Sequence, residues 1–151
     1  AMLSCGAEQL TLIAKTLAHD AAPGSLAFVS TDVKNAFGEV PRTVALRAVR
    51  KFCPLLLPVL LASWALPSTP LFVPVGATAS RAIQATDGLF QGECLSTSVF
   101  CLVMKLVIDR FLALVALEQL GEGVYVNVLA YIDDTVLVCP AELVPRLWVT
   151  H

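Results

Sequence analysis

The sequence is poor in charged residues and in histidine. Asp, Glu, Lys and Arg make up only 15% of its 151 residues, and the formal net charge is −2. It therefore lacks the excess of basic residues with which nucleic-acid-binding proteins usually meet phosphates. With two histidines and no Cys-x-x-Cys pair among five cysteines, it also lacks the usual ligands of a zinc site. Such cysteines are typical of reduced, mostly buried thiols in an intracellular protein.

The chain also lacks an uninterrupted hydrophobic run of membrane-spanning length, although 57% of its residues are hydrophobic. A spanning helix needs about 20 apolar residues. The run 55–66 is broken by Pro58, and the run 96–120 contains Lys105 and Asp109, which are costly in lipid. No signal-type stretch opens the chain. We therefore expect no membrane segment.

Hydrophobic periodicity predicts a mixture of helices and short strands. Apolar residues at helical spacing predict helices over 7–18, 42–52, 55–64, 96–117 and 141–149. Short apolar runs predict strands over 26–30, 126–132 and 135–139, and a small hairpin from 71–75 and 81–85. The sequence contains no internal repeat and no evident boundary. It therefore predicts a single α+β domain.

Two adjacent carboxylates, Asp133 and Asp134, stand between the last two predicted strands, where a hairpin would turn. Like charges in neighbouring positions repel each other, and this turn has neither Gly nor Asn to ease a tight bend. A divalent cation would neutralise the pair. The alternative is a solvated acidic turn, because Asp is common in turns.

A third carboxylate, Asp32, follows the strand predicted over 26–30 and can face the hairpin from a neighbouring strand. Three carboxylates from two strands can hold two Mg²⁺ ions, an arrangement that stabilises the attacking and leaving oxygens in phosphoryl transfer. We therefore expect Asp32, Asp133 and Asp134 to converge into a metal site.

Three segments stand in an order that is more specific than any one of them. They are Asp32 with Asn35-Ala36-Phe37, then Gln91-Gly92 with Leu95-Ser96 and Phe100, then Tyr131-Ile132-Asp133-Asp134. This ordered set resembles palm motifs A, B and C of reverse transcriptases, in the form found in non-LTR retrotransposons, and the likeness spans residues 5–139. It implies a polymerase palm, a small antiparallel sheet with an Asp-Asp hairpin packed on helices. Residues 1–151 would then be a single partial reverse transcriptase domain, palm with part of the fingers, without the N-terminal fingers and the thumb.

The resemblance implies RNA-directed DNA synthesis, a nucleotidyl transfer in which a primer 3′ hydroxyl attacks the α-phosphate of a dNTP. Asp32 and Asp133 would bind two Mg²⁺ ions, with Mn²⁺ as a substitute, and Asp134 would complete the cluster. The main-chain carbonyl of Val33 would be an extra metal ligand. The implied partners are an RNA template, a DNA primer, dNTP and the missing fingers and thumb of a parent polyprotein. The implied location is intracellular, and nuclear for a non-LTR retroelement.

The resemblance also assigns substrate contacts. Phe37, with Ala36 beside it, stands where the family places an aromatic plate under the sugar, which favours dNTP over NTP. Gln91 and Gly92 would meet the templating base and the incoming nucleotide, and Tyr131 would flank the primer terminus. Structural alternatives stay open, because Phe37 and Tyr131 can be packing residues and Gly92 can serve only the loop before the next helix.

Departures from the family pattern bear on activity. Glu93 and Cys94 stand where the family usually has Asp and Pro, and Thr97 replaces a second Pro, so the loop loses stiffness. Lys34 and Arg42 are interpreted as solvated charges. We therefore expect the isolated chain to be inactive, as a fragment of a retroelement enzyme.

Two alternatives are a decayed or domesticated palm that binds nucleic acid or protein without catalysis, and a membrane-associated protein whose aspartate pair is accidental.

Overall fold

The computed structural model describes the backbone of residues 6–65, 71–72, 81–82, 87–90, 92–117 and 124–149. The chain divides into two compact units. Unit 1 consists of Ala1–Lys34 and Leu106–His151, and unit 2 consists of Asn35–Lys105. Unit 1 is assembled from two separate stretches of the chain, which no local sequence signal indicates. The described part of the chain is α+β, as predicted.

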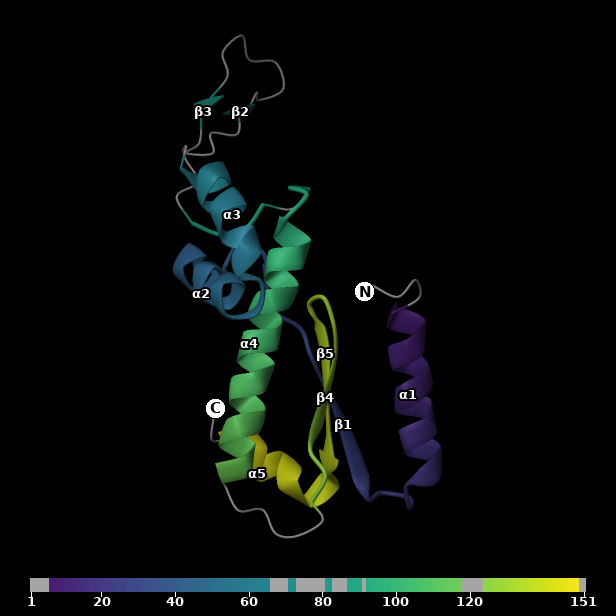
Figure 1. Ribbon diagram of the computed structural model, residues 1–151. Coiled ribbons are helices and arrows are strands. Elements are labelled where there is room, and N and C mark those ends of the chain that lie inside the picture. Colours follow the sequence, from purple (N-terminus) through teal and green to yellow (C-terminus); the bar gives the residue numbers. More distant parts are fainter. Residues whose placement is uncertain are drawn as a thin grey trace. The chain divides into compact units, whose positions relative to one another are not determined.

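Unit 1 is built on an antiparallel sheet of three strands in the order β1-β5-β4 (Figure 1). The strands are β1 (Leu26–Thr31), β4 (Asn127–Tyr131) and β5 (Asp134–Pro140). All three were predicted, and their bounds agree with the prediction to within one residue at each end. Their Val- and Leu-rich sequences suit the pleated, half-buried surface of a sheet.

Helices lie on both faces of this sheet. The helix α1 (Gly6–Asp20) contacts β4 on one face. On the other face Cys139 is buried with Val115 of α4 (Ser96–Leu117) and with Leu147 of α5 (Val144–Val149). A 3-10 turn, η2 (Ala141–Leu143), leads from β5 into α5. Because side chains alternate along a strand, the even-numbered residues Asp134 and Val136 of β5 face α1.

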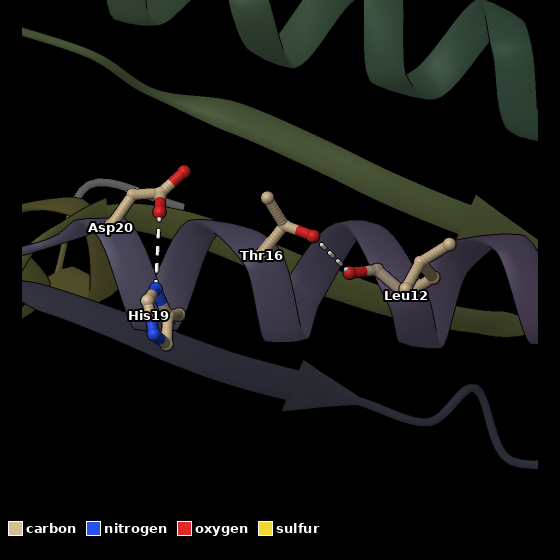
Figure 2. A network of polar contacts seen from close by, with 4 residues as sticks. All are labelled: Leu12, Thr16, His19 and Asp20. Atoms are coloured by element: carbon tan, nitrogen blue, oxygen red, sulfur yellow. Dashed lines mark hydrogen bonds and ion pairs between the residues drawn. The ribbon is translucent and has the colours of Figure 1, made fainter.

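Two short-range polar contacts lie on the exposed surface of α1 (Figure 2). The Thr16 hydroxyl donates a hydrogen bond to the carbonyl of Leu12 over 3.0 Å, the usual i−4 bond of a helical threonine. His19 lies in the last turn, and its Nδ1 is 3.2 Å from Oδ1 of Asp20. Both members of this pair are largely exposed, so the pair contributes little stability.

Unit 2 contains α2 (Arg42–Phe52), the 3-10 turn η1 (Pro54–Leu56), α3 (Leu57–Trp64) and the first turns of α4. The bounds predicted for α2 and α4 are confirmed. The helix predicted over 55–64 is shorter, because Pro54 opens a separate 3-10 turn before α3 begins. Buried Ala45, Ala48 and Val49 form the inward face of α2 at helical spacing.

The hairpin predicted from 71–75 and 81–85 is described only in part. The structure pairs β2 (Leu71–Phe72) with β3 (Arg81–Ala82) in antiparallel fashion. Residues 73–75 and 83–85 lie outside the described residues. Within the described residues, no helix combines the length and the apolar character that crossing a membrane requires.

The prediction of mostly buried thiols is wrong for the described cysteines. Cys139 is buried and Cys101 is half-buried, whereas Cys53 and Cys94 are exposed. The exposed pair lies where helices end or begin, directly after α2 and just before α4. Burial raises the pKa of the Cys101 and Cys139 thiols, which makes them less reactive.

Candidate functional site

The three candidate aspartates all lie in unit 1, at one end of its sheet. Thr31, the last residue of β1, is opposite Thr135 of β5. Asp32 follows this last paired position of β1 and Asp134 directly precedes it in β5, so both residues lie at the same end of the sheet. Asp133 lies in the turn that joins β4 to β5. The sheet therefore places Asp32 at the same end as Asp133 and Asp134, which come much later in the sequence.

Two threonines, which the sequence analysis did not single out, connect the strands next to these aspartates. The hydroxyls of Thr31 and Thr135 hydrogen-bond to each other, and the Thr135 hydroxyl also lies 3.4 Å from the carbonyl oxygen of Thr31. Thr135 is buried. A cross-strand threonine pair stabilises a sheet by about 0.2–1 kcal/mol. Here the pair supports the last paired position of β1 and β5, next to Asp32 and Asp134.

The turn that carries Asp133 lies one residue earlier in the chain than predicted. Tyr131 pairs with Asp134, so Ile132 and Asp133 form a two-residue loop. The prediction that both aspartates lie in the turn is thus wrong for Asp134, which begins β5. Ile132 has a φ of +57°, a conformation that costs a side-chain-bearing residue about 1–2 kcal/mol. Two-residue hairpins demand positive φ, and the paired strands on either side hold the isoleucine there.

The aspartates are accessible to solvent. Asp32 and Asp134 are exposed and Asp133 is half-buried. Within the described residues, no hydrogen bond or ion pair reaches any of the three carboxylates. Accessible carboxylates without donors suit a hard divalent cation, which takes oxygen ligands and retains water. In the described part of the chain, no three His, Cys, Asp or Glu side chains are gathered closely enough to hold a metal ion. The convergence of the three carboxylates therefore stays a prediction.

A groove runs between α1 and the sheet face on which Asp134 lies. Its walls are mainly apolar and include Leu10 and Ala14 of α1 and Phe28 of β1. Asp134 and Tyr131 line the same groove, and the side chain of Tyr131 is 41% exposed. The groove therefore gives solvent access to one of the aspartates and to the aromatic residue paired with it.

The substrate residues predicted after Asp32 fall on both sides of the division between the units. Val33 belongs to unit 1, and its side chain is exposed. Ala36 and Phe37 belong to unit 2, where Ala36 is buried. The Phe37 ring stacks on the buried ring of Phe100, with centroids 4.6 Å apart and planes inclined by 21°. Packing thus accounts for one face of the Phe37 ring, and its contact with a sugar stays a prediction.

The second predicted substrate segment is only partly described. Gln91 lies outside the described residues. Gly92 is exposed with a φ of +93°, and a Cβ at this position would meet no other atom within 4 Å. Its backbone conformation therefore favours glycine, while the space around it is open to a ligand.

Glu93, which departs from the family pattern, has a structural role at the start of α4. Its two carboxylate oxygens accept hydrogen bonds from the hydroxyls of Ser63, over 3.1 Å, and Ser96, over 3.0 Å. Ser96 is buried. The pair of bonds therefore joins the end of α3 to the first turn of α4.

The interpretation of Arg42 as a solvated charge is wrong. Arg42 is half-buried, its Nε donates a hydrogen bond to the carbonyl of Gly88 over 3.4 Å, and its guanidinium lies 5.1 Å from the centroid of the Trp64 ring. Sequence reasoning also missed Asp87. Hydrogen bonds from the backbone N–H groups of Arg42 and Gly88 hold the pKa of the Asp87 carboxyl below its usual range.

No protein-family model matches the sequence, and neither a curated protein nor a solved structure matches the chain. The likeness to reverse transcriptases accordingly rests on the motif residues and their order in the sequence.

Proposed function

We propose that this chain is part of the palm of a reverse transcriptase, and that it serves RNA-directed DNA synthesis by a two-metal mechanism in the intact enzyme. One observation carries the proposal. The pairing of Thr31 with Thr135 puts Asp32 and Asp134 at the same end of the sheet, beside a two-residue turn that contains Asp133. A small antiparallel sheet flanked by helices is compatible with such a palm.

In this proposal the aspartates hold the reacting groups in place. Asp32 and Asp133 bind the two Mg²⁺ ions, with the Val33 carbonyl as an extra ligand, and Asp134 completes the negative charge of the site. The ions would lower the pKa of the attacking hydroxyl and stabilise charge on the leaving oxygens. Tyr131, paired with Asp134 and partly exposed, flanks the primer terminus. Most of the catalytic effect then comes from position and charge.

The proposal gives Phe37 the task of excluding a ribose. Its support is the stack on Phe100, which is itself only 1% exposed and therefore cannot yield easily. A ring held from behind by a fixed neighbour can reject a 2′ hydroxyl by steric contact. Gln91 and Gly92 would contact the templating base and the incoming nucleotide, and Gly92 has the open surroundings that a close approach needs.

A second candidate function is binding without catalysis. The observation that favours it is Glu93, whose carboxylate is engaged by the Ser63 and Ser96 hydroxyls. A position that the family usually gives to Asp therefore serves the internal structure of this chain. The two candidates differ in whether bound metal leads to primer extension.

Metal binding is the first test. We expect the chain to bind Mn²⁺, observed through its enhancement of water proton relaxation, and Asp133→Asn to weaken the affinity by about tenfold or more. Asp20→Asn removes an equal charge from exposed α1 and should leave the affinity unchanged. Equal affinities in the wild type and Asp133→Asn would contradict the metal site.

Primer extension is the second test. It uses the complete open reading frame that contains this chain, with an RNA template, a DNA primer, dNTP and Mg²⁺. We expect extension by the wild type and a loss of about a thousandfold in Asp133→Asn, because the metals supply several kcal/mol of transition-state stabilisation. Metal binding without extension in the wild type would favour the non-catalytic candidate instead.

A further inference from the structure

Asp87 joins two segments of unit 2 that are 45 residues apart in the sequence. Its Oδ1 accepts a hydrogen bond from the backbone N–H of Arg42 over 2.6 Å and another from that of Gly88 over 3.0 Å. Arg42 is the first residue of α2, and N–H groups in the first turn of a helix have no partner within the helix. Pro41, directly before α2, has no side-chain acceptor to cap it. Asp87 therefore acts as the cap of α2 from a distant loop.

The loop that follows Asp87 lies directly against the turn that carries Phe37. The backbone N–H of Leu89 donates a hydrogen bond to the carbonyl of Phe37 over 2.8 Å. Gly88 has a φ of +81°, and a Cβ on it would lie 2.6 Å from the carbonyl oxygen of Gly38. The two backbones are thus in close contact, with no room for a side chain between them.

The Arg42 side chain also contacts the junction between the Asp87–Leu89 loop and the turn of Phe37 and Gly38. Its Nε reaches the Gly88 carbonyl, and its guanidinium lies over the Trp64 ring of α3. Arg42 thus donates its backbone N–H to Asp87 and its side chain to the next residue of the same loop. These contacts all belong to unit 2.

We propose that Asp87 is a positioning residue for nucleotide selection. By joining the start of α2 to the Gly88 loop, it holds the turn of Ala36 and Phe37 against the segment that leads to Gly92. The inference rests on the proposed function and deepens it, because the closeness of Phe37 to the sugar would then depend on Asp87. Asp87 itself touches no nucleotide and acts through the Leu89–Phe37 hydrogen bond. Small displacements of a positioning group are known to change rates strongly.

Amide hydrogen exchange on the chain tests the holding role without any activity. In Asp87→Ala we expect the Leu89 amide, which is bound to Phe37 and not to Asp87, to exchange about fivefold faster or more. Asp87→Asn keeps an oxygen that can accept both N–H bonds, so its Leu89 amide should exchange much closer to the wild-type rate than that of Asp87→Ala. If Asp87 only capped α2 locally, Asp87→Ala would change the exchange rates of the Arg42 and Gly88 amides alone. An unchanged Leu89 amide in Asp87→Ala therefore overturns the proposal.

Nucleotide selection is tested by primer extension with the complete open reading frame, comparing kcat/KM for dNTP and NTP. We expect Asp87→Ala to lower the preference for dNTP by about tenfold, and Asp87→Asn to retain it. An equal decrease in kcat/KM for dNTP and NTP would show a merely structural role for Asp87 and would overturn the proposal. If the wild type extends no primer, the proposed function fails and selection fails with it, while hydrogen exchange still decides whether Asp87 holds the turn.

Discussion

Acidic side chains are unpaired at one place in the described structure and fully engaged at another. The first place is the end of the sheet in unit 1, and the second is the junction in unit 2, where the loop of Asp87–Leu89 contacts the turn of Phe37 and Gly38. Within the described residues, Asp32, Asp133 and Asp134 have no hydrogen-bond or ion-pair partner. Asp87 and Glu93, in contrast, each accept two hydrogen bonds from their own unit. A carboxylate whose bonds are made internally serves the fold, whereas one that lacks donors is available to a cation.

The two units also differ in how they form a turn with positive φ. In unit 2, Asn35 adopts a φ of +51°, which asparagine tolerates well. In unit 1, Ile132 adopts a φ of +57°, which a β-branched residue avoids. The strained turn is the one beside the candidate metal ligands. Strain of this kind persists where the surrounding structure enforces it, and it is often found at functional sites.

The close contact of Gly88 with Gly38 in unit 2 predicts the largest effect of a substitution on stability. Gly88→Ala would add a Cβ against the Gly38 carbonyl, in a backbone conformation that alanine disfavours. We expect it to lower the free energy of unfolding by about 2–4 kcal/mol, measured by urea denaturation. Gly92→Ala is the matched control, because it shares the positive φ but meets open space, and it should cost only about 1 kcal/mol. Equal costs would show that the junction has room to adjust.

The strained turn at Ile132 predicts a smaller change in stability, this time an increase. Ile132→Asn should raise the free energy of unfolding by about 1 kcal/mol, because asparagine accepts the left-handed conformation. The reverse exchange in the other unit, Asn35→Ile, should lower it by a similar or larger amount. Thermal and urea unfolding of both variants measures the difference. A destabilised Ile132→Asn variant would mean that side-chain packing of Ile132 outweighs its backbone strain.

The internal hydrogen bonds of Asp87 predict the smallest effect, a dependence of stability on acid pH. Because the folded pKa of Asp87 is lowered from its ordinary value of 3.8, the stability it supplies is complete above that value. It is lost as the pH falls through the folded pKa. Between about pH 5 and about pH 2, the urea midpoint of the wild type should therefore fall more than that of Asp87→Asn. Parallel curves would show that the hydrogen bonds of Asp87 favour neither protonation state.

Local patterns predicted most of the secondary structure. The bounds of α2 and α4 follow from helical periodicity, and the strands follow from short runs of branched apolar residues. The predictions failed where a contact with another segment decides the outcome. Arg42 appeared to be solvated because its partners Trp64, Asp87 and Gly88 come later in the chain. Asp134 was assigned to the turn because only strand pairing shows where the turn ends.

By itself, the sequence determined which segments are helices and strands and which acidic residues end or join those strands, because periodicity and turn chemistry act over a few neighbouring residues. Only the tertiary structure decided that Asp32 lies at the same end of the sheet as Asp134, and that Asp87 caps a helix 45 residues before it. Register and capping across loops depend on which surfaces pack together. That choice is made by the whole chain, so no single segment contains it.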